Sequence, residues 1–438
     1  MLFFSHYLLT FFNAILIILV FEETSMTVNG IIAEYNPFHN GHLYQLEESR
    51  RLTNADYTVV IMSGDFVQRG APALICKHAR AKMALGCGAD LVIELPVLYA
   101  AASAEYFAAG AVALLDKLGV VTHLCFGSEC GNDALLWQLA RALSEEPEEY
   151  RTALKQFLKE GAAYPCARSR ALDAVRSLEL PEGWREILAS PNNLLGMEYI
   201  RALLKRNSSI TPVTVKRLGA GYHETMHGSA LAIRQTLRQG ADRENAKKAV
   251  YSDMPPKAAS ILLGQLKERP PMHGDALSSI LYFKLFRESE YGYEKYLDLS
   301  SDLSDRIQKM LGSFTGYEAF CQLLKTRNMT YSRISRCLLH ILLDIEKEHM
   351  ELGRSLDYAP YARVLGFRKE ALPLLTAIKR HSSIPLVTKL LRGQKCLPKD
   401  ACRLLNLDIR ASGIYNGVLW SGSGRPAPSE FSTPLVLL

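Results

Sequence analysis

The sequence of 438 residues has no internal repeat and no long low-complexity tract. It also lacks a strong charge excess, since 51 basic and 45 acidic residues leave a formal net charge of +6. Such a charge permits a polyanionic partner only if the cations gather on one face. Hydrophobic residues make up 48% and charged residues 22%, which is typical of a globular enzyme. A chain of this length exceeds one hydrophobic core, so two or three domains are expected.

The nine cysteines show no disulfide framework and no zinc-site spacing. Cys125 and Cys130 are the closest pair, but no matching Cys or His pair follows them at the spacing of a zinc site. We therefore predict reduced thiols that serve packing, no protein-built metal site and a cytoplasmic location.

Residues 1–25 form an apolar N-terminal extension. The run from Leu2 to Val20 is nearly long enough to span a bilayer, which would make it a membrane anchor. No Lys or Arg precedes Arg50, however, so the basic flank of a signal or anchor is missing. Met26 lies just ahead of a strand-like run, and we favour it as the true start, with no membrane partner.

From Met26 onward, short β-branched runs alternate with longer helical patterns, which predicts an α/β fold with a Rossmann-like parallel sheet. Expected strands lie near Gly30–Ala33, Tyr57–Met62, Asp90–Glu94, Thr122–Phe126 and Val213–Arg217. The expected organisation is a nucleotide-binding domain over 26–250, with a helical insertion over 132–209, followed by a mainly helical domain over 256–438. Strand signals fade after about Pro255, and a Gly-, Ser- and Pro-rich tail runs from Ser421 to Pro434.

Unusual polar residues follow three of these strands directly. They are the segments 36–42, 64–70 and 127–129. Because the carboxyl ends of parallel strands meet at one edge of a sheet, where ligands bind, these loops are expected to build a single site.

His39-Asn40-Gly41-His42 places two imidazoles three residues apart, where a loop turns into a helix. Free N–H groups at a helix start favour phosphate oxygens, and the two histidines can add donors to charge that develops on a phosphorus atom. The alternative is an ordinary capped helix start with two surface histidines. The position directly after the first strand favours the phosphate site.

The chain resembles the tRNA(Met) cytidine acetate ligase family of the HxGH nucleotidylyltransferase superfamily. The resemblance runs from Met26 to near the C-terminus and does not include residues 1–25. The motifs that carry it are the segments 30–44 (GIIAEYNPFHNGHLY), 66–70 (FVQRG), 93–96 (IELP), 103–107 (SAEYF), 126–129 (FGSE), 190–193 (SPNN) and 408–411 (DIRA).

The resemblance implies that ATP activates acetate to acetyl-adenylate with release of pyrophosphate. The acetyl group then passes to N4 of the wobble cytidine of elongator tRNA(Met), with release of AMP and without acetyl-CoA. His39 and His42 would be the catalytic residues, and Mg²⁺ is expected to accompany ATP. The implied ATP-binding residues are Ile32, Ala33, Glu34, Tyr35, Asn36, Pro37, Phe38, His39, Asn40, Gly41, His42, Leu43, Tyr44, Gln45, Gly127, Asn192 and Arg217, with Asn193 as an adjacent candidate.

From the residues alone, other roles stay open for several of these positions. Arg217 could form a surface salt bridge, and Asn192-Asn193 after Pro191 could cap a helix. Ser229 and Arg234 match a second phosphate motif of the superfamily imperfectly, because Leu231 stands where a hydroxyl residue is expected. Further candidates are Asp65 and Arg69, which could orient substrate or form a turn, and Lys77, His78 and Arg80, which could line the exit for pyrophosphate.

Two basic groups lie in the segment 256–438. Residues 363–395 contain eight Lys or Arg against one acid, Glu370, and a second group comprises Lys325, Arg327, Arg333 and Arg336 beside Tyr331. Both could contact the tRNA backbone or form a solvated basic face. The rival function is a small-molecule nucleotidylyltransferase, against which this basic helical segment argues.

Overall fold

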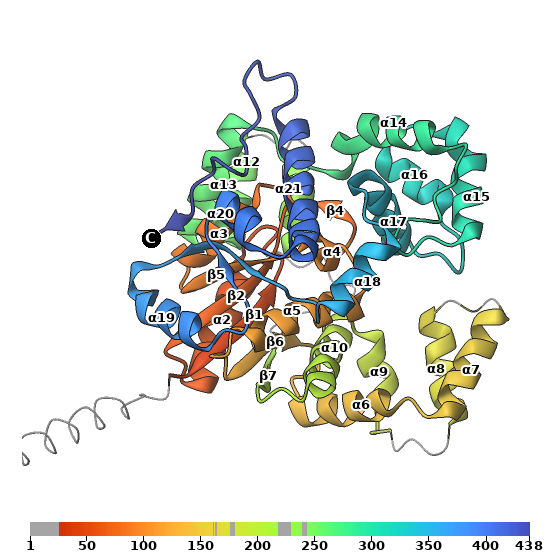
Figure 1. The fold of residues 1–438 in the computed structure, drawn as a ribbon, viewed down its shortest axis with the longest axis horizontal. Helices are drawn as coiled ribbons and strands as arrows, with labels where there is room; N and C mark the ends of the chain where they lie inside the picture. Colours follow the sequence, from red (N-terminus) through yellow and green to blue (C-terminus); the bar gives the residue numbers. More distant parts are fainter. Residues whose placement is uncertain (1–25, 161, 163, 176–179, 218–228, 239–242) are drawn as a thin grey trace, which may run out of the picture.

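The computed structural model describes residues 26–160, 162, 164–175, 180–217, 229–238 and 243–438. An eight-stranded sheet runs through it in the order β10-β8-β5-β2-β1-β6-β7, with β9 paired to β8 (Figure 1). Its strands are β1 (Val28–Ala33), β2 (Tyr57–Ser63), β5 (Leu91–Leu95), β6 (His123–Ser128), β7 (Thr211–Lys216), β8 (Ala362–Phe367), β9 (Leu386–Val387) and β10 (Val436–Leu437). Helices cover it, so the expected α/β fold is confirmed.

The five strands predicted from the sequence form the contiguous parallel part of the sheet. β1 pairs in parallel with β2 and β6, β2 pairs with β5, and β6 pairs with β7. The carboxyl ends of β1, β2 and β6 therefore lie at one edge, as the polar loops required. A short hairpin of β3 (Phe66–Val67) and β4 (Ala71–Pro72) follows β2 at this edge.

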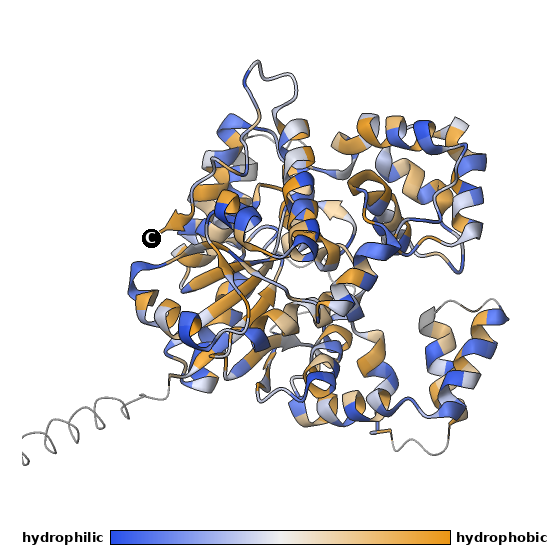
Figure 2. Ribbon diagram, in the orientation of Figure 1, coloured by the Kyte–Doolittle hydropathy of each residue, from blue (hydrophilic) through white to orange (hydrophobic). Residues whose placement is uncertain are grey.

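Helices cover both faces of the sheet, and the alternation along β2 shows how. Val59 and Ile61 belong to the core on the side of α5 (Ala104–Lys117), whereas Val60 and Met62 belong to the core on the side of α2 (Asn40–Thr53) and α3 (Lys77–Gly86). A strand buried on both faces is apolar at every position, which explains the continuous hydrophobic run. Figure 2 shows this run in the middle of the molecule.

A helical insertion connects β6 to β7. The helices of the insertion are α6 (Asp133–Glu145), α7 (Glu148–Lys159), α8 (Tyr164–Ala174), α9 (Trp184–Ala189) and α10 (Pro191–Arg206). Its last helix, α10, packs against β6. Its helices α7 and α8 pack against each other and stand away from the sheet (Figure 1).

The segment after β7 is mainly helical and shares the core of the sheet, since Leu277 and Leu338 pack in the same buried cluster as Val59. Its helices are α11 (Ala230–Arg238), α12 (Arg243–Asp253), α13 (Pro256–Glu268), η1 (Gly274–Leu277), α14 (Ser278–Glu288), α15 (Ser301–Met310), η2 (Leu311–Ser313), α16 (Tyr317–Leu324), α17 (Tyr331–Leu343), α18 (Lys347–Ser355), η3 (Lys369–Ala371), α19 (Leu372–His381), α20 (Leu390–Cys396) and α21 (Lys399–Trp420). The short α4 (Val97–Ala100) follows β5.

Three strands come from the segment in which the sequence predicted none. β8 pairs antiparallel with β5, and β9 and β10 pair with β8. The strand β8 interrupts its apolar run with Arg363 and Gly366, and β9 and β10 have two residues each, so none shows a clear strand pattern. The sheet is thus shared between the segments 26–250 and 256–438. The division into domains at this boundary stays a prediction.

Within the described ranges, no helix combines the length and the hydrophobicity that crossing a bilayer requires. The apolar extension over residues 1–25, expected either as a membrane anchor or as sequence upstream of the true start, lies outside the described residues.

Candidate functional site

The turn after β1 delivers both histidines to the start of α2. His39 is the N-cap residue, and its Nδ1 accepts a hydrogen bond from the N–H of Gly41 at 3.0 Å. His42 Nδ1 accepts from the N–H of His39 at 3.2 Å, which completes a capping box made of two imidazoles. A Cβ at residue 41 would lie 2.9 Å from His39 Cε1, so only glycine lets the ring fold back over the helix start.

These two hydrogen bonds determine the tautomer of each ring. Because Nδ1 accepts, a neutral imidazole must carry its proton on Nε2, which leaves an N–H donor on the opposite side of the ring. The rings stack with their centroids 3.7 Å apart. The pair therefore presents two N–H donors from one helix start.

Both histidines are held neutral by their surroundings. Burial, together with the charges of Arg217 and Arg234, lowers the pKa of His39 to about 4. Burial, His39 and Arg217 hold the pKa of His42 well below its ordinary value. The two guanidinium groups make the site electropositive, which is why a further positive charge on an imidazole is unfavourable there. The same positive charge favours the binding of an anionic ligand.

The segment 34–39 is built into the core on one side. Tyr35 and Phe38 are fully buried, with ring centroids 4.7 Å apart. Asn36 Oδ1 accepts from the N–H of Leu74 at 2.7 Å, and Arg234 Nη1 donates to the Asn36 carbonyl at 2.6 Å. Hydrogen bonds from neighbouring segments thus fix the conformation of the turn. The backbone that carries the histidines is therefore held in place.

The loop after β6 meets the start of α10 through Glu129. Its carboxylate accepts hydrogen bonds from the backbone N–H groups of Asn192 at 3.3 Å and Asn193 at 2.8 Å, and from Asn192 Nδ2 at 2.6 Å. In return, Asn193 Oδ1 accepts from the N–H groups of Glu129 and Cys130. A carboxylate at a helix start is favourable. Asn193 is buried by this exchange, whereas Asn192 stays partly exposed.

Arg217 extends from the end of β7 over Gly127. Its backbone N–H donates to the Ser128 carbonyl at 3.0 Å, and its side chain is exposed. A Cβ at residue 127 would meet Arg217 Cγ at 3.5 Å, an ordinary contact, so packing within the chain does not require glycine there. Arg217 also affects the pKa of both histidines, which places Gly127, Arg217 and the histidine pair together.

The second motif candidate forms the start of α11. Ser229 Oγ accepts from the N–H of Ala232 at 3.1 Å, and Arg234 reaches Asn36. Leu231 is exposed, with 48% of its surface accessible. Arg234 thus joins the histidine turn, while Ser229 acts as an ordinary helix cap in the described structure.

Two candidates for the pyrophosphate exit are structural instead. Lys77 is fully buried, and its Nζ lies 2.8 Å from Glu94 Oε1 and 2.9 Å from Glu430 Oε2. Arg80 is also fully buried and donates to backbone carbonyls, including those of Glu34 at 2.6 Å and Gly64. Neither side chain can reach a departing ligand, so that expectation is wrong for both. The carboxylates and carbonyls that surround them come from other segments of the chain, so the local sequence gave no signal of their burial.

Asp65 belongs to the same buried network. Its carboxylate accepts from the N–H of Lys77 and from Ser412 Oγ, both at 2.8 Å. His78 is half-buried and lies 3.7 Å from Glu430. Arg69, in contrast, is exposed on the β3–β4 hairpin near Arg234. Asp65 therefore has a structural role and does not contact substrate. Of these two residues, Arg69 is the one that stays exposed near the site.

Cys125 and Cys130 do not form a ligand pair. Cys125 is buried, and burial raises the pKa of its thiol to about 12, whereas the Cys130 thiol lies near Ser128 Oγ. All nine cysteines are free thiols.

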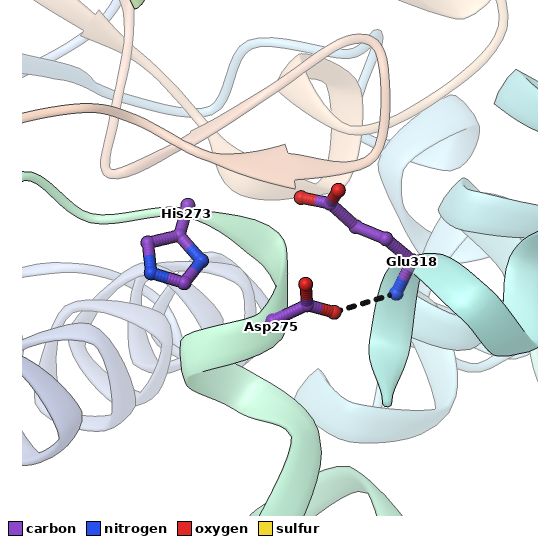
Figure 3. Close-up of side chains that lie close together, drawn as sticks. All are labelled: His273, Asp275 and Glu318. Carbon is purple, nitrogen blue, oxygen red and sulfur yellow. Dashed lines mark hydrogen bonds between the residues drawn. The ribbon is translucent and has the colours of Figure 1, made fainter. Parts of the chain in front are cut away.

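One group with metal-ligand atoms does occur in the described residues, formed by His273, Asp275 and Glu318, with those atoms within 4.8 Å of one another (Figure 3). Arg238 of α11 pairs with Asp275 Oδ2 at 3.1 Å and with Glu318 Oε2 at 2.6 Å. The guanidinium already occupies one oxygen of each carboxylate, so the group ties α11 to α16.

The basic residues over 363–395 divide into two kinds. Arg363 is buried against Glu94 and Glu430, and Arg368 lies near Asp90 and Glu370. The other six side chains are exposed around α19 and α20, and no ion pair joins them to other described residues. They are Lys369, Lys379, Arg380, Lys389, Arg392 and Lys395. We call these six the α19–α20 cations.

The second basic group is less uniform. Lys325 and Arg327 are exposed, whereas Arg336 is mostly buried, and burial lowers the pKa of its guanidinium.

The parallel strands of the sheet carry an HxGH helix start at their carboxyl edge, with Gly127 near the end of β6 and Arg217 beside it. This combination is that of an α/β nucleotidyltransferase. Residues 26–425 match the family described as HIGH Nucleotidyl Transferase. The chain belongs to this family and, within it, to the tRNA(Met) cytidine acetate ligases, as its relatives show.

Among these relatives, the tRNA(Met) cytidine acetate ligase of Acetivibrio thermocellus is 38% identical over 419 residues, which cover 94% of this chain and 100% of that protein. The enzyme of the same name from Clostridium kluyveri is 41% identical over 398 residues, or 89% of this chain and 95% of that protein. The crystal structure of Thermotoga maritima TmcAL bound with alpha-thio ATP is 34% identical, with a TM-score of 0.86, and covers 94% of this chain and 100% of that one.

Proposed function

We propose that the chain is an ATP-dependent acetate ligase that forms N4-acetylcytidine at the wobble position of elongator tRNA(Met). Acetyl-adenylate is the intermediate, and AMP and pyrophosphate are the products. The observation that carries the proposal is the pair of neutral imidazoles at the start of α2, which direct Nε2–H donors toward a site flanked by Arg217 and Arg234. Relatives that cover nearly the whole chain bear the corresponding name.

ATP would lie along the carboxyl edge of the sheet, held by residues 32–45 together with Gly127, Asn192 and Arg217. The open face of Gly127 would allow the nucleotide to approach the β6 strand end, and Arg217 would supply a permanent charge to a phosphate. Asn192 would offer the part of its side chain that Glu129 leaves free. The T. maritima relative was crystallised with an ATP analogue, which supports a nucleotide in this fold.

In the first step, an acetate oxygen attacks the α-phosphorus of ATP and the bond to pyrophosphate breaks. Negative charge grows on the non-bridging oxygens, where Nε2–H donors of His39 and His42 can stabilise it without a proton transfer. No protein nucleophile is needed. Mg²⁺ would arrive with ATP and be held by the phosphates and water, because carboxylates of the described residues near the histidine pair do not form a cluster around a cation.

The tRNA would bind through the α19–α20 cations, since backbone phosphates are neutralised by exposed Lys and Arg side chains. Lys325 and Arg327 would extend this surface. An enzyme that acts on tRNA would work in the cytoplasm.

The test is an assay with purified enzyme, ATP, labelled acetate and tRNA(Met). We expect label in the RNA and free AMP as a product, with no requirement for acetyl-CoA. A small-molecule nucleotidylyltransferase would instead attach AMP to its product, and the names of the relatives do not support it. Label that enters RNA only when acetyl-CoA is supplied would refute the proposal.

A further inference from the structure

Three carboxylates follow the strands β1, β2 and β6 at the carboxyl edge of the sheet, and two of them are fully engaged. Asp65 is buried and bonded to the Lys77 N–H and Ser412 Oγ. Glu129 accepts three hydrogen bonds at the start of α10. The third carboxylate belongs to Glu34, which immediately follows β1 and is only half-buried.

Glu34 is fixed in place on two sides. Its Oε1 accepts from the N–H of Gln68 on the β3–β4 hairpin at 3.0 Å, and its backbone carbonyl accepts from Arg80 at 2.6 Å. The other oxygen, Oε2, accepts no hydrogen bond from the described residues. The geometry is that of a positioned carboxylate with one oxygen left for a ligand.

The groups around Glu34 place it on the ligand side of the turn. Arg234 of α11 lies close to it, and the same guanidinium bonds the Asn36 carbonyl and affects the pKa of His39. Tyr199 of α10 lies on another side, where burial raises the pKa of its phenol and the Glu34 charge raises it further. Because Arg234 also bonds the turn that contains His39, Glu34 lies beside the proposed site.

The backbone of residue 34 can line the proposed ATP site, but the charge of its side chain opposes the first half of the proposed reaction. ATP and acetate are both anions, and an added negative charge disfavours their binding. The second half has the opposite need, because the attacking N4 amine is neutral and must lose a proton as it becomes an amide. A carboxylate within hydrogen-bond reach supplies the acceptor for that proton.

We propose that Glu34 is the general base of acetyl transfer, an inference that rests on the proposed function. The N4 lone pair attacks the acetyl carbonyl carbon, and a new C–N bond forms. The C–O bond to the phosphate of AMP then breaks, and AMP leaves with that electron pair. The proton from N4 passes to Glu34 Oε2 and from there to solvent, so amine and acetyl-adenylate yield amide, AMP and a proton.

The test separates the two half-reactions in wild type and Glu34→Gln. Glutamine keeps the carbonyl acceptor for the Gln68 N–H but cannot take a proton. Acetate-dependent exchange of pyrophosphate into ATP reports the first half, and single-turnover transfer from synthetic acetyl-adenylate to tRNA(Met) reports the second. We expect transfer to fall by about two to four orders of magnitude. Exchange should fall far less than transfer, because only the side chain changes in a segment proposed to hold ATP, and Glu34→Asp should restore part of the transfer.

Glu129→Gln is the matched control, since it removes a carboxylate that only holds Asn192 and Asn193, and it should lower both half-reactions together. Thermal unfolding of each variant reports its folding. If exchange falls as far as transfer, Glu34 is a Mg²⁺ ligand or a clamp for the hairpin, and the proposal is wrong. Transfer at the wild-type rate in Glu34→Gln would also overturn it. A wild-type enzyme that shows no acetate-dependent exchange would refute the proposed function itself.

Discussion

At the scale of single residues, each histidine of the HxGH turn has one observed role and one proposed role. Nδ1 closes the capping box of α2. This leaves Nε2–H free to be the donor that we propose for a phosphate oxygen. The two roles are chemically separable, because an asparagine side chain can cap a helix through its oxygen but has no atom at the place of Nε2.

We therefore expect His39→Asn to fold with nearly the stability of the wild type and to lose about 100-fold to 1000-fold in acetate-dependent pyrophosphate exchange. His39→Ala should lose the same activity and, in addition, about 1 kcal/mol of stability with the cap. The measurements are exchange rates and chemical unfolding of both variants. An active His39→Asn enzyme would show that the imidazole serves only as a cap.

The low pKa of His39 also predicts how stability depends on pH. The unfolded chain binds a proton near the ordinary value of 6.5, and the folded protein binds it only near about 4. Stability is thus complete above pH 6.5 and falls as the pH drops toward 4, by at most about 1.4 kcal/mol per pH unit for this residue. His39→Asn should show a shallower fall in urea unfolding across this window. Equal slopes would contradict a depressed pKa.

At the scale of elements, α10 contacts both β6 and the loop that follows it, so its position couples the two. Gly196 lies against the Phe126 ring, and a Cβ there would overlap the ring atoms. One turn earlier, Asn192 and Asn193 hold the loop that contains Glu129. A shift of α10 would therefore move the loop that follows Gly127.

Gly196→Ala should destabilise the protein by about 1–3 kcal/mol through overpacking and should raise the KM for ATP. Gly264→Ala is the control, because nothing lies within 4 Å of a Cβ at that position in α13 and alanine favours helix. This second variant should be as stable as the wild type or slightly more stable. Thermal unfolding and exchange kinetics report both effects, and an unaffected Gly196→Ala enzyme would exclude the coupling.

The elements also show which features a sequence can predict. The five parallel strands and the HxGH turn were predictable because strand periodicity and loop chemistry are local. The expectation that Lys77 and Arg80 line the exit for pyrophosphate is wrong, because the groups that bury them, Glu430 and the Gly64 carbonyl among them, follow from tertiary packing. The strand β8 was missed because Arg363 interrupts its apolar pattern.

At the scale of the whole molecule, a buried ion network joins the C-terminal part of the chain to the nucleotide-binding half. Glu430 pairs with both Lys77 and Arg363, and these two cations also share Glu94. Burial alone would raise the pKa of Glu430, but the charges of Lys77 and Arg363 hold it below its ordinary value.

Removing one partner from such a network leaves a buried charge uncompensated. Glu430→Gln should therefore destabilise the protein by about 3–5 kcal/mol. Glu348→Gln, which breaks the exposed pair with Arg403, should change stability by less than about 1 kcal/mol. Denaturant unfolding compares the two variants. Equal small effects would mean that the network contributes little.

The α19–α20 cations make a second prediction at this scale. Replacing Lys379, Arg380 and Arg392 by Gln should weaken tRNA binding and make the slope of log affinity against log salt shallower by about one for each phosphate that the variant no longer neutralises. Lys155→Gln and Lys159→Gln, on exposed positions of α7, should leave the slope unchanged. Filter binding over a salt series measures it, and a slope unaffected by the first set would place the RNA elsewhere.

The chemistry proposed for the HxGH turn begins with attack of an acetate oxygen on the α-phosphorus of ATP. This attack can be followed by supplying ¹⁸O-labelled acetate, ATP and tRNA(Met) to the enzyme and analysing the released AMP by mass spectrometry. We expect AMP that carries an ¹⁸O atom from acetate, because the oxygen that bridges acetyl and phosphate stays with the phosphate when the acetyl group is transferred. AMP without the label, formed while acetyl groups enter the RNA, would contradict an acetyl-adenylate intermediate.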